Sequence, residues 1–456
     1  MEKRNLDNRD RDDRELEVLT PLEKRQLRRQ RRIRNQVIAY VSLAIVVVVL
    51  LGGGIFGTKK LTELINQKDQ EQQIQEQLTQ MSEEAIPEEE LIPEEIIEEV
   101  PVQPTKEELL DEIVDARISE MTLEDKVAGL FLVNPESITG VTTAVQAGEG
   151  TKEALEKYKV GGLVYFAKNI QSAEQIKEML ANTVSYSATP LFLAVDEEGG
   201  RVTRLASTLK LEDVGPMADI GATNDPSQAY AAMQKVGGYL KEHGFNLNFA
   251  PVADVLTNPD NKDIGDRSFG SDPSAVASMV TSAASGLKDS GIISCIKHFP
   301  GIGAAGGNTH TGLVVVDRSL EELRSVELVP YQAAIEAGVP MIMVGHISLP
   351  QIIGDNTPAT MSSAILSQLL RADLGFNGVI ITDAMNMQAI TDYYGADEAA
   401  IMALKAGADM ILMPEDFELA WKGVIAAVQD GTIAEERIND SLKRVYRIKY
   451  ADAVSE

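Results

Sequence analysis

Ile292–Gly312, with the sequence IISCIKHFPGIGAAGGNTHTG, is the stretch on which the interpretation of the whole chain depends. It begins with the apolar, partly β-branched run Ile292–Ile296, which predicts a buried strand. Lys297 and His298 follow, and then a glycine-rich segment that ends at His310. A strand that delivers polar side chains into a loop is typical of the active-site end of an α/β barrel. Glycine-rich loops also bind phosphate groups, so the stretch alone leaves both interpretations open.

From residue 105 to residue 456 short apolar runs alternate with amphipathic helical patterns. The β-rich runs are Val127–Val133, Val160–Phe166, Leu191–Val195, Leu247–Val255, Ile292–Ile296, Pro340–Gly345, Val379–Thr382 and Met410–Met413. The helical patterns between them include Ala173–Thr183, Pro226–His243, Ala275–Ser290, Leu320–Ala337, Ser362–Leu374 and Ala396–Ala406. Strands that alternate with helices predict a parallel sheet, and the eight β-rich runs predict a single (β/α)8 TIM-type barrel. The first run is also compatible with a helix.

Polar residues stand where several of these runs end. They are Asp196, Asp254, Lys297, His298, His346 and Asp383. In a barrel such positions meet at the C-terminal mouth, where catalytic residues lie. The chain has no G-x-G-x-x-G between a strand and a helix and no G-x-x-x-x-G-K-[ST], which argues against a nucleotide-binding site.

Asp383 ends a buried run, where a carboxylate costs desolvation free energy unless another group pairs with it or uses it. It can cap the following helix, or it can act as a nucleophile or a charge stabiliser in the mouth. Asp254 and His346 can contact a ligand or support a neighbouring loop. His243 lies in a helical pattern, and we expect it to be structural.

Asp196 and Arg204 flank the segment Glu198-Gly199-Gly200-Arg201. A carboxylate and guanidinium groups around a Gly-Gly turn can hold the hydroxyl groups of a sugar through directional hydrogen bonds. A structural salt-bridge network is the alternative for Glu198 and Arg201. Arg267 allows the same two interpretations.

Composition excludes several classes of site. The formal net charge of −28 argues against a nucleic-acid partner, because binding to phosphates needs a basic face. A single cysteine, Cys295, excludes a disulfide framework, a CxxC redox pair and a thiolate zinc site. It lies in an apolar run, which favours a buried inert thiol. No H-E-x-x-H or comparable spacing occurs, so we expect no metal site.

Residues 37–57 form an uncharged, mostly apolar segment, long enough to cross a hydrocarbon core of roughly 30 Å. Just before it lies a basic cluster of Lys24, Arg25, Arg28, Arg29, Arg31, Arg32 and Arg34. By the positive-inside rule, residues 1–36 form a cytoplasmic tail and the chain after the span lies outside the cell membrane. A cleaved signal peptide is the alternative, although its apolar region would normally be only about 7–15 residues long.

Residues 58–104 are rich in Glu, Gln and Pro. Such a composition cannot bury enough apolar surface to fold alone. We therefore expect a disordered acidic stalk between the transmembrane helix and a folded domain at 105–456.

Four ordered motifs resemble glycoside hydrolase family 3, and most closely its NagZ-type β-N-acetylhexosaminidases. They are Asp196–Arg204 (DEEGGRVTR), Asp266–Gly270 (DRSFG), Lys297–Gly301 (KHFPG) and Thr382–Met385 (TDAM). The resemblance runs from about residue 110 to residue 450. It implies a single (β/α)8 barrel, whereas the larger β-glucosidases of the family add a second α/β domain.

The resemblance also implies roles for individual residues. Asp383 matches the nucleophile that forms a covalent glycosyl-enzyme, and His310 matches the general acid/base on a mobile loop. Asp196, Arg204, Arg267, Lys297 and His298 match positions that bind the N-acetylglucosamine unit. A retaining mechanism needs one carboxylate and a proton donor that later becomes the base, and an imidazole that titrates near neutral pH can be that donor. This chemistry needs no cofactor.

The chain departs from the family pattern at two positions. Asn308 stands where the family usually has the aspartate of an Asp-His dyad, and Ile302 replaces a usual histidine. An asparagine cannot supply the charge that stabilises an imidazolium. Either hydrolysis is slowed, or another carboxylate stabilises the protonated form of His310.

Taken together, these features predict a membrane-anchored, exo-acting β-N-acetylhexosaminidase. It would release non-reducing N-acetylglucosamine from glycans or muropeptides of the cell wall, outside the membrane, and act as a monomer. The main alternative is a catalytically weakened wall-binding protein. A β-glucosidase and an enzyme that transfers the sugar to phosphate are further alternatives.

We expect Asn308→Asp to leave turnover unchanged or to raise it, because an aspartate restores the charge that stabilises a protonated His310. Turnover of a chromogenic N-acetylglucosaminide by the two proteins measures the effect. A large loss in the variant would show instead that the asparagine is a functional partner in its own right.

Overall fold

The computed structural model describes residues 104–307 and 312–454. The expected transmembrane helix and nearly all of the expected stalk lie outside these residues, and so do Asn308 and His310. In the part of the chain that the structure describes, no helix is both long and apolar enough to cross a membrane. The anchor at residues 37–57 therefore stays a prediction.

Eight parallel strands form one sheet in the order β10-β1-β2-β3-β4-β5-β7-β9. They are β1 (Phe131–Val133), β2 (Gly162–Tyr165), β3 (Phe192–Val195), β4 (Leu247–Asn248), β5 (Ile293–Phe299), β7 (Met341–Val344), β9 (Val379–Thr382) and β10 (Ile411–Leu412). A parallel bridge between Ile381 and Met410 joins the two ends of this order. The Thr382 N–H also donates to the Met410 carbonyl at 3.1 Å. The sheet thus nearly closes on itself, in agreement with the expected TIM-type barrel.

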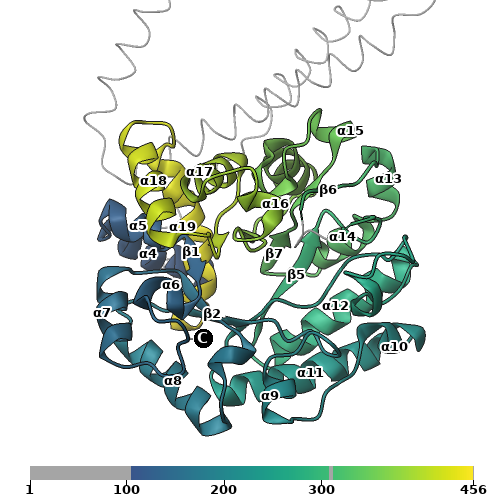
Figure 1. Cartoon of the computed structure of the whole chain (residues 1–456), viewed down its shortest axis with the longest axis horizontal. Coiled ribbons are helices and arrows are strands. Elements are labelled where there is room, and N and C mark those ends of the chain that lie inside the picture. The colour runs from purple at the N-terminus through teal and green to yellow at the C-terminus, as the bar shows by residue number, and fades with distance from the viewer. Residues whose placement is uncertain (1–103, 308–311, 455–456) are drawn as a thin grey trace, which may run out of the picture. The chain divides into compact units, whose positions relative to one another are not determined.

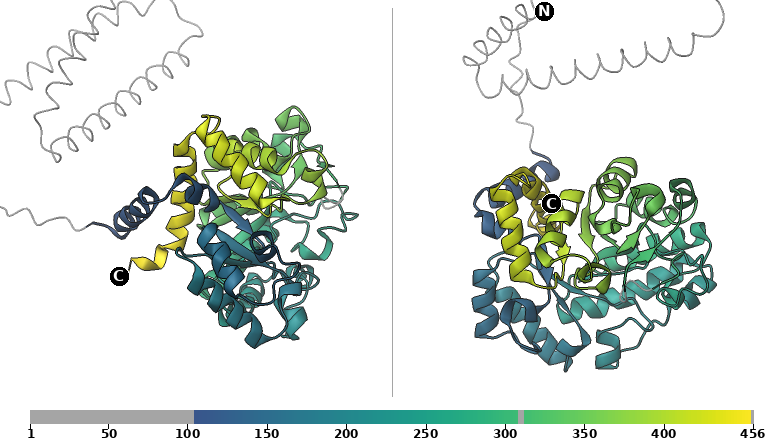
Figure 2. Two further views of the ribbon diagram at one scale, coloured as in Figure 1. Left: turned by 60° about the vertical axis from the view of Figure 1, so that its left-hand side comes forward. Right: turned by 45° about the horizontal axis from the view of Figure 1, so that its top comes forward.

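Helices surround the strands (Figures 1 and 2). The longer ones are α4 (Lys106–Ser119), α7 (Glu149–Lys157), α8 (Ala173–Tyr186), α11 (Pro226–His243), α12 (Pro273–Asp289), α14 (Val329–Glu336), η4 (Ala364–Asp373), α17 (Ala396–Ala406), α18 (Phe417–Gln429) and α19 (Glu435–Lys449). The shorter ones are α5 (Leu123–Ala128), α6 (Pro135–Thr139), α9 (Leu205–Leu209), α10 (Met217–Ala222), α13 (Leu320–Ser325), α15 (Pro350–Ile353) and α16 (Gln388–Thr391). Two more strands, β6 (Val314–Val315) and β8 (Ile347–Ser348), pair with each other outside the barrel.

Three expected elements differ from the observed ones. Of the expected run Leu247–Val255, only Leu247–Asn248 forms a strand, and Val252 adds an isolated bridge to Lys297. In the run Val127–Val133, Val127 and Ala128 are the last two residues of α5, whose first turn Thr122 caps through the Asp125 N–H, and the strand begins only at Phe131. The expected helix Leu320–Ala337 is broken into α13 and α14. Pro330 explains the break, since its ring lacks an N–H and clashes with the carbonyl four residues earlier in a continuous helix. In the structure Pro330 lies in the first turn of α14, where it is tolerated.

The core lies inside the barrel and between the strands and the helices. Every residue of β2, β3, β7 and β9 is buried, as expected for parallel strands that are covered on both faces. Cys295 is also fully buried, and burial raises the pKa of its thiol well above the ordinary value. This agrees with the expectation of an inert thiol.

A buried carboxylate at the start of β10 ties the barrel to the C-terminal helix. Asp409 is fully buried and accepts hydrogen bonds from the Ile380 N–H at 2.9 Å and from Arg444 at 3.2 Å. Arg371 also donates to it, and Arg437 lies 3.7 Å away. Because Arg437 and Arg444 belong to α19, this ion network joins α19 to the closing strands of the barrel.

We predict that Asp409→Asn lowers the free energy of unfolding by about 3–5 kcal/mol, because it leaves three partly buried guanidinium groups without their counter-charge. Urea titration of both proteins measures the difference. Glu120→Gln is the matched control: Glu120 and its partner Arg117 are 72% and 59% exposed, and such a surface pair contributes about 0–1 kcal/mol. Equal losses in the two variants would contradict the prediction.

Candidate active site

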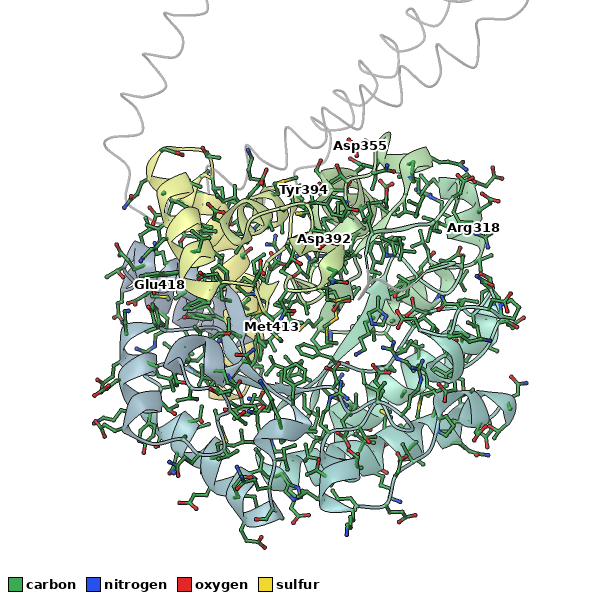
Figure 3. The ribbon with its side chains drawn as sticks, in the orientation of Figure 1. Arg318, Asp355, Asp392, Tyr394, Met413 and Glu418 are labelled. Atoms are coloured by element: carbon green, nitrogen blue, oxygen red, sulfur yellow. The ribbon has the colours of Figure 1, made fainter. Side chains whose placement is uncertain are left out.

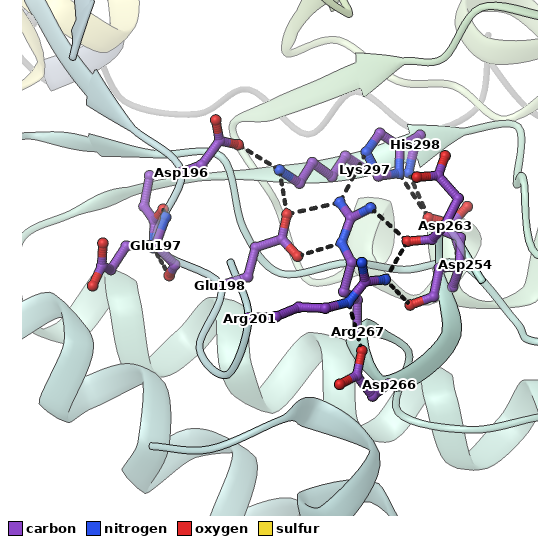
Figure 4. A network of polar contacts seen from close by, with 12 residues as sticks. Asp196, Glu197, Glu198, Arg201, Asp254, Asp263, Asp266, Arg267, Lys297 and His298 are labelled. Atoms are coloured by element: carbon purple, nitrogen blue, oxygen red, sulfur yellow. Dashed lines mark hydrogen bonds and ion pairs between the residues drawn. The ribbon is translucent and has the colours of Figure 1, made fainter. Parts of the chain in front are cut away.

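The ends of β3, β4, β5, β7 and β9 bring the predicted polar residues to one mouth of the barrel. Figure 3 shows the side chains of this region, with Tyr394 and Met413, which follow β9 and β10, among those labelled. Figure 4 shows Asp196, Glu198, Arg267 and Lys297 in one connected polar network. Residues that lie far apart in the sequence therefore meet here, as the barrel prediction required.

Lys297 and His298 both face this network, although they are neighbours in one strand. In a regular strand consecutive side chains point to opposite faces. The pairing of β5 with β7 is irregular between Ile296 and Phe299, at the position of these two residues. The irregularity lets β5 deliver a cation and an imidazole to the same mouth.

Glu198 is the centre of the charge network. Its carboxylate accepts two hydrogen bonds from Arg267, each 2.8 Å long, and lies 2.6 Å from the Lys297 ammonium. Burial opposes its ionisation, but the charges of Lys297 and Arg267 outweigh this effect and hold the pKa of Glu198 far below its ordinary value. Glu198 thus compensates two cations inside the mouth.

Lys297 has a second acidic partner. Its ammonium donates to Asp196 at 2.6 Å, and Asp196 lies 3.8 Å from Arg204. Burial lowers the pKa of Lys297, but the two carboxylates, Asp196 and Glu198, raise it by more, so that its net shift is upward. Lys297 therefore remains an ammonium at neutral pH.

Arg204 has weaker ion pairs than Lys297 and Arg267, because its acidic partner, Asp196, is 3.8 Å away. Its side chain is 26% exposed, and its guanidinium lies 5.9 Å from the centre of the Phe166 ring. Its buried Nε finds no acceptor among the described residues. Arg204 and Asp196, which is 20% exposed, can therefore both bind hydroxyl groups of a ligand in the mouth.

His298 is held by Asp254. Asp254 is fully buried, and its carboxylate lies 2.8 Å from Nδ1 of His298, which donates to it. The same carboxylate accepts from the Ile302 N–H at 2.6 Å. The other ring nitrogen of His298 is 3.4 Å from Arg267. Asp254 thus fixes the orientation of the imidazole and the turn that follows β5.

Asp383 follows β9 and is partly exposed. Burial opposes its ionisation, but His298 and His346 outweigh this effect and lower its pKa. The Ala384 N–H, 2.7 Å from Oδ1, and the more distant Lys297 act in the same direction. A carboxylate that stays ionised in this position is suited to attack a ligand or to stabilise positive charge on it.

The remaining candidates have structural contacts. Arg201 donates to Asp266 at 2.7 Å and to backbone carbonyls of residues 262–264, in agreement with the salt-bridge interpretation. His346 bonds to the Thr360 hydroxyl and to the Ala384 carbonyl, both at 2.9 Å. It therefore lies next to Asp383. His243 is buried, with Nδ1 2.6 Å from a helix carbonyl, as expected for a structural histidine.

Glu197 is a part of the site that sequence reasoning missed. Its buried carboxylate accepts from the N–H groups of Arg204, Leu205 and Ala206 at 2.6, 2.9 and 2.9 Å. The Tyr239 hydroxyl donates to it as well, at 2.9 Å. Glu197 thereby closes the loop that presents Arg204. The sequence showed only an acidic residue in a polar loop. Its partner Tyr239 lies on α11, far away in the sequence.

The turn after Glu198 shows why this loop contains two glycines. Gly199 and Gly200 have φ angles of 100° and 57°, which other residues rarely adopt. An added Cβ would lie 2.8 Å from the Gly215 carbonyl at the first position and 2.9 Å from Pro216 at the second. The Gly-Gly pair therefore lets the chain turn back and aim Glu198 into the mouth.

In the described residues, no group of three or more His, Cys, Asp or Glu side chains is arranged to hold a metal ion. Ile302, where the family usually has a histidine, is buried in the turn after β5. Asn308 and His310 are not among the residues that the structure describes. Their predicted roles are taken up below as proposals.

We predict that Glu198→Gln destabilises the protein by about 3–5 kcal/mol near neutral pH, because two cations lose a buried partner. A carboxyl with a depressed folded-state pKa contributes stability above its unfolded pKa, here 4.5, and loses it as pH falls toward the folded-state value. The difference between the two proteins should therefore be constant from about pH 6 to 8 and shrink below about pH 4.5. Urea unfolding at each pH measures it, and a difference independent of pH would contradict the assignment.

The chain is similar to known proteins that are named beta-hexosaminidases. Beta-hexosaminidase A of Pseudoalteromonas piscicida is 35% identical over 328 residues, which cover 65% of this chain and 54% of that protein. The chain thus spans about half the length of this relative. Beta-hexosaminidase LpqI of Mycobacterium tuberculosis is 34% identical over 335 residues, which cover 71% of this chain and 82% of that protein.

The fold is also similar to that of a solved structure. The glycoside hydrolase family 3 β-N-acetylglucosaminidase from Paenibacillus sp. str. FPU-7 superposes with a TM-score of 0.67 and 35% identity, covering 74% of this chain and 64% of that one. The model of the glycosyl hydrolase family 3 N-terminal domain matches residues 122–448. The match spans the whole barrel, and the chain therefore belongs to glycosyl hydrolase family 3.

Proposed function

We propose that the chain is an exo-acting, retaining β-N-acetylhexosaminidase. The observation that carries the proposal is the position of Asp383, a partly exposed carboxylate with a lowered pKa, in the mouth that also holds the ion pairs of Lys297 with Asp196 and Glu198. The names of the relatives, beta-hexosaminidase and β-N-acetylglucosaminidase, support the sugar class. The family itself supports glycoside hydrolysis.

In the proposed mechanism Asp383 attacks the anomeric carbon and forms a covalent glycosyl-enzyme. His310 donates a proton to the departing glycosidic oxygen. Water then attacks the same carbon, His310 takes its proton, and Asp383 is released as a carboxylate. The low pKa of Asp383 supports its part, since a nucleophile must be ionised at working pH.

Substrate binding is assigned to Asp196, Arg204, Arg267, Lys297 and His298. The partly exposed Asp196 and Arg204 would exchange hydrogen bonds with sugar hydroxyls. Arg267 and His298 are more buried, and Glu198 and Asp254 hold them in fixed orientations. A site that is ordered before the sugar arrives loses less conformational freedom on binding.

We further propose that the enzyme acts on glycans or muropeptides of the cell wall, outside a membrane to which residues 37–57 anchor it. The uncharged span and the basic cluster before it support this location. We expect the barrel to work as a monomer.

Asn308 favours one second candidate, a protein that binds the wall sugar but hydrolyses it slowly. The usual aspartate would stabilise the protonated acid/base, and asparagine carries no charge to do so. Both candidates share the same binding residues, so only turnover separates them.

The test is incubation of the full chain with a chromogenic N-acetylglucosaminide and with the matching glucoside, each with and without phosphate. We expect turnover of the N-acetylglucosaminide, and Asp383→Ala should lower it on the order of 10⁴-fold or more. Asp430→Ala, an exposed aspartate at the end of α18, is the control and should leave the rate unchanged.

Each other outcome supports a different activity. Binding of N-acetylglucosamine without turnover favours the weakened wall-binding protein. Preference for the glucoside indicates a β-glucosidase, and acceleration by phosphate indicates a phosphorylase. Full turnover in Asp383→Ala would overturn the assigned nucleophile.

A further inference from the structure

Glu327 is a buried carboxylate that the proposed mechanism does not use. It lies in the break between α13 and α14, and its side chain is fully buried. No described residue donates a hydrogen bond to either of its oxygens. The nearest cation is Arg318, whose Nε is 3.5 Å from Oε1. A buried carboxylate that accepts no hydrogen bond and has only one nearby cation costs desolvation free energy. A role for Glu327 in the protein would explain why this cost is tolerated.

The side chain of Glu327 packs on the turn that follows β5. A Cβ added to Gly301 would lie 2.8 Å from Cβ of Glu327 and 2.9 Å from its Cγ. Gly301 has a φ of 120°, so only glycine fits this turn without strain. The Gly301 N–H donates to the carbonyl of His298 at 2.8 Å. Glu327 thus supports the turn directly next to a proposed substrate-binding residue.

The same turn is joined to the imidazole through Asp254. The residue after Gly301, Ile302, donates its N–H to Oδ1 of Asp254, and the other oxygen of that carboxylate holds Nδ1 of His298. A shift of the turn would therefore move Asp254 and with it the imidazole. Glu327 can influence His298 through this path without touching a ligand.

Arg318, which Figure 3 labels, lies in the segment that leads into α13. Its guanidinium is 3.4 Å from the Thr257 hydroxyl, in the segment after β4, and 3.8 Å from Glu322. Two residues earlier, the Val316 N–H donates to the Ser348 carbonyl at 2.9 Å. Arg318 therefore lies where the segment before α13 contacts the segments after β4 and β7.

We propose that Glu327 and Arg318 are positioning residues: the ion pair between this buried carboxylate and a partly exposed guanidinium sets the turn after β5 and, through it, the orientation of His298 in the sugar-binding mouth. The inference rests on the proposed function, because the turn matters only if this mouth binds the sugar. Neither residue is assigned contact with substrate.

The charge of Glu327 has a measurable consequence for stability. Burial raises its pKa, and Glu322 and Asp254 act in the same direction, whereas Arg318 lowers it. A carboxyl with a raised folded-state pKa stabilises the protein at low pH and loses that contribution as pH rises through the folded-state value. At neutral pH the native side chain therefore carries a free-energy cost, which a neutral isostere removes.

The experiment compares Glu327→Gln with wild type in the full chain. We expect its thermal stability at pH 7 to be equal or higher, while kcat/KM for the chromogenic N-acetylglucosaminide falls about tenfold or more, since misplacing a group by ~1 Å costs up to about 100-fold. Glu336→Gln, an exposed glutamate at the end of α14, is the matched control and should change neither quantity.

A second variant separates positioning from plain structural support. Arg318→Gln removes the counter-charge of the buried Glu327 and should lower the thermal midpoint of unfolding. Adding Glu327→Gln to this variant should restore most of the lost thermal stability. Activity should stay low in the double variant, because the ion pair is still absent. A structural role alone would predict that activity returns together with stability.

Two results would overturn the inference. One is wild-type activity in Glu327→Gln. The other is that activity follows thermal stability in all three variants, so that both are lost and regained together. Wild-type turnover reports on the proposed function separately. If wild type binds N-acetylglucosamine without turnover, the dissociation constant from calorimetry replaces kcat/KM, and the same variants should weaken binding. Binding of equal strength in Glu327→Gln would then reject the positioning role.

Discussion

The buried ion pairs of Glu198 hold the mouth of this barrel together. Lys297 and Arg267 are only 4% and 11% exposed, and without a carboxylate between them two cations would lie unpaired in a region of low dielectric constant. Glu198 comes from the loop after β3, Arg267 from the segment after β4 and Lys297 from β5. One charge compensation therefore connects three successive units of the barrel at its C-terminal end.

The carboxylates at this mouth have different roles, which depend on the groups around them. Glu197 faces backbone N–H groups and shapes a loop, and Glu198 faces cations and balances charge. Asp254 faces an imidazole and a backbone N–H and fixes their orientation. Asp383 is partly exposed and remains ionised, which leaves it able to meet a ligand. Identical chemical groups thus acquire different roles from their neighbours alone.

Much of this arrangement could be predicted because it depends on local pattern. Alternating apolar runs and helical patterns indicate the parallel barrel, and polar residues at strand ends indicate its mouth. The predicted helix Leu320–Ala337 was wrong because one proline outweighs an otherwise good helical periodicity. The run at Val127 was wrong in its first part, because Val127 and Ala128 belong to α5 and the strand begins only at Phe131.

The sequence by itself determined the fold class, the family and most of the described polar residues that reach the mouth, because periodicity and ordered motifs are properties of neighbouring positions. Only the tertiary structure decided how these residues pair. Glu197 finds Tyr239 on α11, Glu198 binds Arg267 and Lys297 across two loops, and Glu327 packs under Gly301. Such contacts join positions far apart in the chain, and their energies depend on burial, which no local pattern encodes.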